Sequence, residues 1–198
     1  MNVMGIAHVP GGLFSFAVTG FVLASASGAP PVTLTGTART AGRPAENTVV
    51  WLEAPNAPAG PAGRVVLSQR NLTFSPNVLV VRVGTVVDFP NDDRVFHNVF
   101  SFRDGRRFDL GLYPVGLTRK VTFDRAGLSR IFCNIHANMA AYVMTVDSPY
   151  FGRADRSGAF TIAGVPDGTY RYHAWRPGAM ELTGTWTSTG LALTIDWP

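Results

Sequence analysis

The chain has little cysteine, little charge and no long helical pattern. Cys133 is the only cysteine in 198 residues, so no disulfide can form within one chain. Charged residues make up 15% and hydrophobic residues 46%, which is enough apolar material for a core without covalent crosslinks. Long amphipathic helical periods are absent, whereas 21 glycines and 14 prolines favour short strands joined by tight turns. The composition therefore predicts an all-β protein.

Two further absences exclude classes of function. Although the net charge is +4, no run of lysine and arginine alternates with stacking aromatic residues, so nucleic acid is not an expected partner. No Ser/His/Asp order and no paired carboxylates stand out, so an enzyme is not expected either. The basic residues nearest to a patch fit a solvated surface or, more weakly, a docking face for an acidic redox partner. They are Arg103, Arg106, Arg107, Arg119, Lys120, Arg125 and Arg130.

The N-terminal segment has the character of an export signal. Residues 1–26 contain no charged side chain, and Ala24-Ser25-Ala26 has the Ala-x-Ala pattern of a cleavage site. Polar residues and a glycine interrupt the apolar run of residues 13–26, so a retained transmembrane helix is not expected. We expect residues 1–26 to be a signal peptide cut after Ala26, although a start without Lys or Arg is atypical. Export predicts a periplasmic protein without stable membrane insertion.

Four residues carry the candidate chemistry. Cys133, His136 and Met139 have the spacing Cys-x2-His-x2-Met, and His97 lies in an apolar segment upstream. One thiolate, two imidazoles and one thioether are the ligands of a blue-copper electron-transfer site. Held by one short loop and a neighbouring strand, they can keep one geometry in both oxidation states of the metal. The sequence therefore predicts a site for one copper ion.

Other interpretations of these residues remain open. A single cysteine is often a small buried apolar residue, so the site could be degenerate and metal-free. Zinc could accept Cys133, His97 and His136, but it prefers a harder fourth ligand or water over methionine. Met144 is a second thioether nearby; its place in the strand after the loop favours Met139 as the ligand.

Strand-like segments between turns follow one another closely from residue 77 to residue 146. The segment 95–102 carries His97, and segments 129–133 and 140–146 enter and leave the ligand loop. This is the pattern of a Greek-key β-sandwich with the metal at one end. Five phenylalanines of this region are expected in its core: Phe96, Phe100, Phe102, Phe123 and Phe132.

The stretch of residues 77–146 resembles a cupredoxin. The matching segments are Val-Asp-Phe-Pro-Asn at 87–91, His97-Asn98, Phe-Asp-Leu-Gly at 108–111 and Cys-x2-His-x2-Met at 133–139. The two-residue spacer before the methionine is similar to the amicyanin loop. The longer segments at 89–92, 97–101 and 133–136 resemble cupredoxin-containing proteins labelled "methylamine utilization protein". The resemblance implies that His97, Cys133 and His136 are the strong in-plane ligands of a type 1 copper ion and that Met139 is the axial one.

The same resemblance implies how the site would work. Asn98 would either hydrogen-bond toward the Cys133 loop and lock its conformation or, as an asparagine in a strand, pair with a turn. His136 would reach solvent through an apolar patch, where a dehydrogenase, a cytochrome or an oxidase would dock transiently. The candidates for this patch are Ile135, Ala137, Ala140 and Pro114. A multicopper oxidase is not expected, because that family's trinuclear cluster needs more histidines than the four in this chain.

The flanking segments resemble a carboxypeptidase-regulatory-like domain, a small transthyretin-like β-sandwich. Its opening matches Leu-Thr-Gly-Thr at 34–37 and Val-Val-Trp-Leu at 49–52, and its later part matches Asp-x2-Gly-x-Phe at 155–160 and Val-Pro-x-Gly-Thr-Tyr at 165–170. Because the copper segment splits these parts, we predict a cupredoxin sandwich, residues 61–147, inserted into a discontinuous sandwich of residues 27–60 and 148–198. His173 in the latter is expected to be a surface or packed histidine.

Two functions compete on these grounds. The first, which we favour, is a periplasmic carrier of single electrons that alternates between Cu(II) and Cu(I). The second is a module for binding or delivering copper, or for interactions in the envelope, without an electron-carrier role. The second would favour exchangeable Cu(I) and slow electron exchange.

Overall fold

The structure, a computed structural model, describes residue 1 and residues 29–57, 60, 63–102, 104–190 and 192–198. Every regular element in these ranges is a β-strand, which confirms the predicted all-β class. None of these residues belongs to a helix with the length and apolar character of a membrane span. The predicted signal peptide lies outside the described residues except for Met1, so it stays a prediction.

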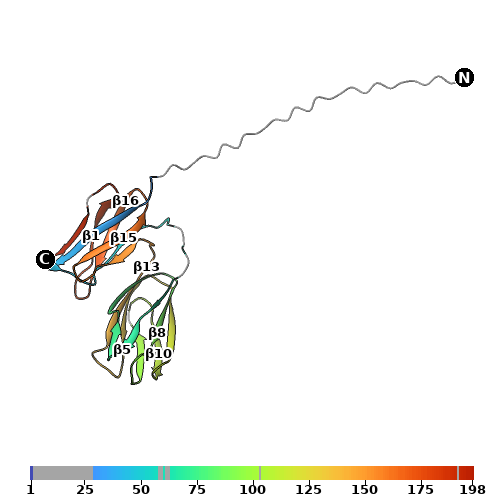
Figure 1. Ribbon diagram of the computed structural model, residues 1–198, viewed down its shortest axis with the longest axis vertical. Helices are drawn as coiled ribbons and strands as arrows, with labels where there is room; N and C mark the ends of the chain where they lie inside the picture. Colours follow the sequence, from blue (N-terminus) through green and yellow to red (C-terminus); the bar gives the residue numbers. More distant parts are fainter. Residues whose placement is uncertain (2–28, 58–59, 61–62, 103, 191) are drawn as a thin grey trace.

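Strands from both ends of the chain form one β-sandwich, which we call the flanking unit (Figure 1). One sheet has the order β15-β1-β18, that is Ala159–Val165, Val32–Thr40 and Leu193–Trp197, and the short β2 (Arg43–Pro44) pairs with β1. The other has the order β14-β3-β16-β17, that is Phe151–Arg153, Val49–Leu52, Thr169–Trp175 and Leu182–Thr187. Alternate residues of β1, Leu34 and Ala38, are buried because one face of the strand points into the core between the sheets.

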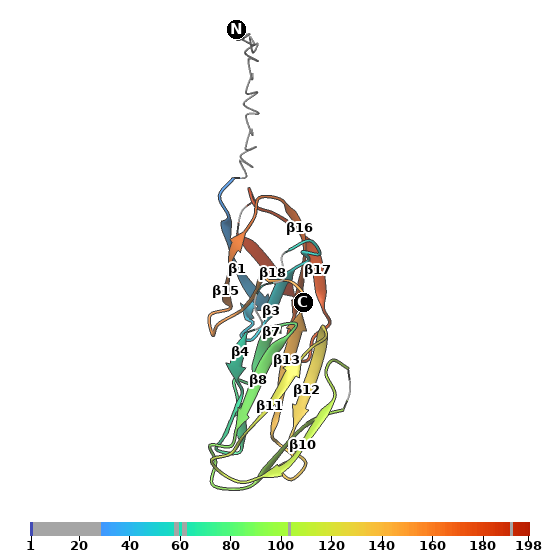
Figure 2. The ribbon, with the colours of Figure 1, turned by 90° about the vertical axis from the view of Figure 1, so that its right-hand side faces the viewer.

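The strands between β3 and β14 form a second sandwich, which we call the inserted unit (Figure 2). Its larger sheet has the order β10-β9-β12-β13-β7, that is Phe108–Tyr113, His97–Ser101, Gly127–Phe132, Ala140–Val146 and Val78–Arg82. Its smaller sheet has the order β11-β8-β4, that is Thr118–Phe123, Thr85–Pro90 and Arg64–Val66. A hairpin of β5 (Ser68–Arg70) and β6 (Thr73–Ser75) completes it. Phe89, Val99, Phe123 and Ile131 are fully buried between the sheets.

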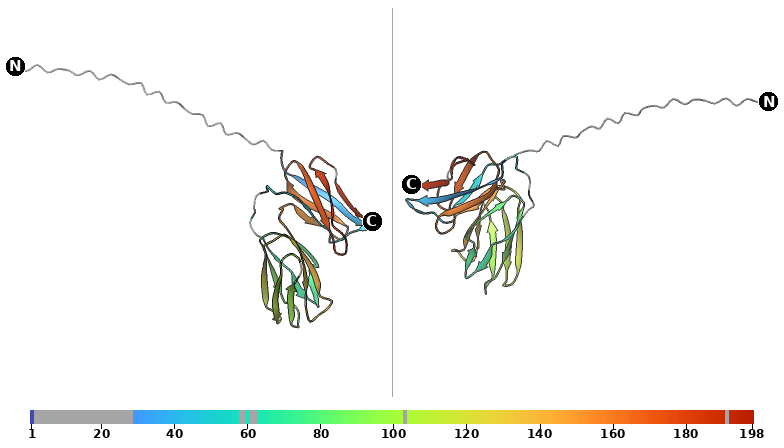
Figure 3. Two further views of the ribbon diagram at one scale, coloured as in Figure 1. Left: turned by 180° about the vertical axis from the view of Figure 1, so that it is seen from behind. Right: turned by 45° about the horizontal axis from the view of Figure 1, so that its top comes forward.

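The two ends of the inserted unit meet at one place in the flanking unit. β3 leads into it and β14 follows it, and these strands pair antiparallel, with Phe151 opposite Trp51. An insertion is tolerated where its ends lie close together, and this pairing supplies that condition. The predicted arrangement, one β-sandwich inserted into another, is therefore confirmed. Figure 3 shows both sandwiches from behind and with the top tilted forward.

A third apolar cluster joins the two units. The outward faces of β7 and β13 contribute Val78 and Met144, and the flanking unit contributes Val49 and Trp175. The Tyr142 ring meets the Trp175 ring edge to face, with centroids 5.4 Å apart. Because these side chains are buried on both sides of the junction, the units pack against each other and are not merely connected. β13 runs from the ligand loop toward this junction, so the loop lies at the opposite end of the inserted unit.

Replacing Trp175 with Ala should lower the free energy of unfolding by about 3–5 kcal/mol, because the substitution removes a large buried aromatic side chain and its contacts at the junction. The Trp175 residue is 9% exposed, whereas Met180 in the same unit is 85% exposed. A Met180→Ala control should change stability by less than about 0.5 kcal/mol in urea titrations. Equal effects of the two substitutions would contradict this account of the junction.

Candidate metal centre

Strand pairing brings His97 and Cys133 together from distant parts of the chain. His97 is the first residue of β9, and Cys133 directly follows β12. β9 and β12 are neighbours in the sheet, with Phe100 opposite Phe132. Ile131 is buried, and alternate residues of a strand share a face, so Cys133 also points into the core and is 5% exposed.

The donor atoms of three predicted ligands converge on one point. His97 Nδ1 lies 3.1 Å from His136 Nδ1, and Cys133 Sγ lies 3.9 Å from the former and 3.6 Å from the latter. Among the described residues, these three form the only group of three or more His, Cys, Asp or Glu whose donor atoms all lie within 4.8 Å of one another. The structure thus brings together the sulfur and the two nitrogens that the sequence predicts to share one site.

Met139 closes the loop that carries two of these donors. The Cys133 amide donates to the Met139 carbonyl at 3.2 Å, and the Met139 amide donates to the His136 carbonyl at 2.9 Å. The Met139 side chain is 1% exposed and belongs to the same buried cluster as Cys133. Met144, the other candidate thioether, packs in the cluster between the two units instead.

These groups fit one soft metal ion. An ion bound to two imidazole nitrogens at about 2.0 Å each holds them no more than about 4 Å apart. The 3.1 Å between the two Nδ1 atoms meets this limit. Thiolate and imidazole suit both copper and zinc, but a buried thioether in the same loop suits copper better, because zinc prefers a harder donor or water.

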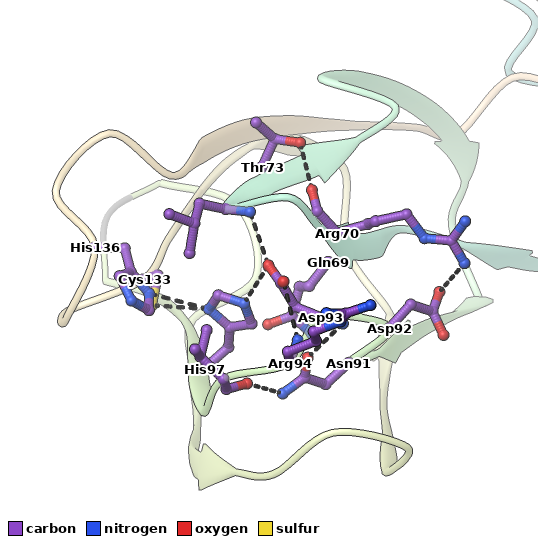
Figure 4. A network of polar contacts seen from close by, with 12 residues as sticks. Gln69, Arg70, Thr73, Asn91, Asp92, Asp93, Arg94, His97, Cys133 and His136 are labelled. Carbon is purple, nitrogen blue, oxygen red and sulfur yellow. Dashed lines mark hydrogen bonds and ion pairs between the residues drawn. The ribbon is translucent and has the colours of Figure 1, made fainter.

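The far side of the His97 ring contacts a carboxylate that sequence reasoning missed. His97 Nε2 lies 3.1 Å from Asp93 Oδ2, and Figure 4 shows the ring between Asp93 and the Cys133 and His136 side chains. The pKa of Asp93 is lowered, chiefly because the Leu72 amide donates to its carboxylate; the Arg94 amide and His97 act in the same direction. The sequence feature that could have indicated this contact is an acidic residue, Asp93, four residues before His97.

A buried polar network holds the loops beside His97. The Asn91 side-chain nitrogen donates to the Val95 carbonyl at 2.8 Å and to the Tyr113 carbonyl at 3.1 Å. This fixes the chain before His97 as a turn, so the predicted strand 95–102 is shorter than expected and spans His97–Ser101. Phe96 and Phe102 flank this strand and are 56% and 53% exposed, so the expectation that both lie in the core was wrong.

Of the two roles predicted for Asn98, the structure shows the one away from the ligand loop. Its side-chain nitrogen donates to Asp109 Oδ1 at 2.7 Å, and among the described residues its side-chain oxygen has no hydrogen-bond partner. Asp109 also accepts from the Gly111 amide at 2.8 Å. Asn98 therefore links β9 to the bulged part of β10 rather than to the ligand loop, because β10 is its direct neighbour in the sheet.

Exposed apolar side chains lie on the ligand loop and on segments that contact His97 or its neighbours. His136 is half-buried, whereas His97 is fully buried, so His136 is the histidine nearer to solvent. Ile135 beside it is 48% exposed, and Ala137 is exposed as predicted. The other large apolar residues that are exposed on these segments are Leu112 in β10 and, outside the strands, Leu72, Val95, Phe96, Val115 and Leu117.

Family and sequence comparisons give little beyond this geometry. Residues 137–188 match the family model of polysaccharide lyase family 4, domain II, which covers less than half of the chain and so assigns no family. No curated protein matches the chain.

Several solved structures are similar to part of the chain. A purple cupredoxin from Nitrosopumilus maritimus is 23% identical, over 41% of this chain and 99% of that one, with a TM-score of 0.38. Amicyanin from Paracoccus versutus is 23% identical over 44% and 85%, with a TM-score of 0.37. A copper-containing nitrite reductase from Thermus scotoductus is 23% identical over 49% of this chain and only 25% of that one, with a TM-score of 0.42. Similarity at this level supports no conclusion about activity, which has to come from the ligand geometry.

Replacing Tyr113 with Phe should destabilise the metal-free protein by about 1–3 kcal/mol, because two buried groups lose a partner. Gln69 donates to the Tyr113 hydroxyl at 2.5 Å, and that hydroxyl donates to the Phe89 carbonyl at 3.0 Å. Burial raises the pKa of Tyr113 from 10.0 to about 12.

The raised pKa gives this prediction a pH dependence. The folded state favours the neutral phenol, so the contribution is complete below the unfolded pKa of 10.0 and is lost as the pH rises through about 12. Urea titrations should therefore show a smaller difference between wild type and Tyr113→Phe at pH about 11 than at pH about 8. A constant difference would contradict a raised pKa.

Proposed function

We propose that this chain is a type 1 copper protein that carries single electrons between redox partners. The observation that carries the proposal is the convergence of Cys133 Sγ with the Nδ1 atoms of His97 and His136, at 3.1 to 3.9 Å from one another. A thiolate and two imidazoles with a weak thioether are the donor set of blue-copper electron-transfer sites. The ligand set, His97, Cys133, His136 and Met139, is part of this proposal.

Copper in such a site supplies a one-electron couple, and the protein supplies a fixed donor geometry. Cys133, His97 and Met139 are buried and belong to packed strands or a hydrogen-bonded loop, so they have little freedom to rearrange. Little rearrangement means little cost when the charge of the site changes by one. His136 is half-buried beside exposed apolar residues, which makes it the place where an electron would enter or leave.

The partner in this proposal binds transiently. Exposed apolar side chains around His136 suit a small interface that forms and separates quickly. A dehydrogenase, a cytochrome or an oxidase would meet this requirement, in a periplasm if residues 1–26 direct export. Membership of the "methylamine utilization protein" type of cupredoxin, with a regulatory-like flanking sandwich, belongs to the same proposal.

A carrier is favoured over an enzyme by the number of metal-ligating groups. The described residues hold a single cluster of His, Cys, Asp or Glu donors, and a catalytic copper protein needs a second metal site or an open position for substrate. In the proposed ligand set, Met139, which is buried in the same cluster as Cys133, would be the fourth donor and would leave no open position for a substrate. We therefore propose that the chain alone does not catalyse a reaction.

Copper titration of the purified protein tests the proposal directly. One equivalent of Cu(II) should produce an intense blue or green thiolate-to-copper absorption band, and Cys133→Ser should abolish it, because no other thiol exists in the chain. His173→Ala is the matched control, since His173 lies in the flanking unit between Glu53 and Glu181 and should leave the band unchanged. Absence of the band at stoichiometric copper would reject the proposed function.

Substitution of the two methionines separates the axial ligand from packing. Met139→Leu should keep the absorption band and raise the reduction potential, because loss of a weak donor favours Cu(I). Met144→Leu should leave the potential unchanged, because that side chain packs between the two units. Cyclic voltammetry gives both values, and a shift with Met144→Leu alone would contradict the assignment.

Copper exchange separates a carrier from a copper-delivery module. A carrier should release Cu(I) slowly and exchange electrons quickly between its two oxidation states. A delivery module should release Cu(I) readily to a chelator and exchange electrons slowly. Measurement of the Cu(I) off-rate together with electron self-exchange decides between them.

A further inference from the structure

We infer that Asp93 is a positioning residue that holds the outer nitrogen of the His97 ring, and that its negative charge lowers the reduction potential of the site. The inference rests on the proposed function, because it concerns the copper ion that His97 would bind. It adds a residue outside the ligand set and a sign for its effect on the potential.

The geometry places the His97 ring between two sets of contacts. On one side, Nε2 lies 3.1 Å from Asp93 Oδ2; on the other, Nδ1 lies 3.1 Å from His136 Nδ1 and 3.9 Å from Cys133 Sγ (Figure 4). An ionised carboxylate only accepts hydrogen bonds, so Nε2 must carry the hydrogen that it donates to Asp93. In a neutral ring, Nδ1 then keeps its lone pair and faces the cysteine. Asp93 thereby selects the tautomer that can bind a metal through Nδ1.

The Asp93 carboxylate is itself held in place by backbone groups. The Leu72 amide donates to Oδ2 at 2.7 Å, the Arg94 amide donates to Oδ1 at 3.0 Å, and the Asp93 amide donates to Asn91 Oδ1 at 3.0 Å. Leu72 belongs to the two-residue turn of the β5–β6 hairpin, and both turn residues have positive φ, 53° for Asn71 and 55° for Leu72. Such a turn is uncommon for leucine, and here it aims the Leu72 amide at Asp93.

Burial makes the Asp93 charge effective at the site. The His97 side chain is 0% exposed and that of Asp93 is 14% exposed, so water screens the pair weakly. Among the described residues, His97 is the only cationic or potentially cationic group paired with Asp93, whereas Arg70 pairs with Asp92 at 4.0 Å. A negative charge next to a ligand favours the more positive metal state, Cu(II), and a carboxylate partner makes the imidazole a stronger donor. Both effects lower the reduction potential.

Two substitutions separate the charge from the hydrogen bond. In Asp93→Asn, an amide oxygen in the place of Oδ2 can still accept from Leu72 and His97, so the charge is lost while the bond to His97 is kept. The amide nitrogen then replaces Oδ1, so the bond from the Arg94 amide is lost as well. Asp93→Ala removes the charge and the acceptor together. Asp92→Asn is the matched control, because Asp92 is the adjacent carboxylate and accepts from Ser68 Oγ at 2.7 Å. Within the described part of the chain, its carboxylate makes no hydrogen bond to a candidate ligand residue.

We expect Asp93→Asn to shift the ratio of Cu(II) to Cu(I) affinity by about tenfold toward Cu(I). For a one-electron couple this equals a potential raised by about 59 mV in voltammetry. Asp92→Asn should shift the potential by less than a third of that amount. A wild-type absorption band combined with equal potentials for Asp93→Asn and Asp92→Asn would overturn the inference and leave the proposed function intact, whereas absence of the band in the wild type would overturn the proposed function.

A measurement without copper tests the positioning role independently. In the metal-free protein, ¹⁵N NMR should show the His97 ring with its hydrogen on Nε2, and Asp93→Ala should convert it to a mixture of both tautomers. Circular dichroism and urea titration of the same variant would show that it is folded. A wild-type His97 with its hydrogen on Nδ1, or an unchanged Nε2–H form in folded Asp93→Ala, would overturn the inference.

Discussion

The pairing of β9 with β12 is the contact on which the candidate site depends. It places His97 beside Cys133, although 36 residues separate them, whereas His136 and Met139 come with Cys133 in one loop. Local spacing alone gives three donors; the fourth requires the sheet to form. Because the imidazole and the thiolate both enter from rigid strand ends, their separation is set by the sandwich core and not by flexible loops.

The loops at this end of the sandwich are ordered by polar side chains. Asn91 is fully buried and bonds the carbonyls of Val95 and Tyr113, so two loops share one anchor. The hairpin of β5 and β6 reaches the same region through the Leu72 amide and Asp93. A buried polar network of this kind stabilises one arrangement of the loops, because an unpaired member would cost free energy. The candidate ligands thus rest on a second layer of side chains that the donor motif does not reveal.

The opposite end of the inserted unit is closed by the flanking unit. β13 leaves the ligand loop and ends among Trp51, Trp175 and Phe151, where both units bury apolar surface. In the proposed function, a partner would therefore dock at the other end, where Ile135 beside His136 is exposed. The flanking unit also contains His173, which stacks on Trp51 with ring centroids 4.8 Å apart and bonds two glutamates; it is a packed histidine, as expected.

The sequence by itself determined the all-β class, because strand periodicity and turn residues are local features, and it predicts a donor set from the Cys-x2-His-x2-Met spacing and His97. The insertion of one sandwich into another was predicted from the resemblance of the two flanking segments to parts of a single small β-sandwich. Only the tertiary structure decided which other side chains surround the candidate ligands and which of them are exposed. Asn98 bonds Asp109, Asp93 contacts His97, and Phe96 lies at the surface, since each depends on which strands become neighbours and on how the Asn91 turn directs the chain. Contacts between residues far apart in sequence, or across a turn held by a side chain, leave no periodic signal, and so they follow from the folded sheet alone.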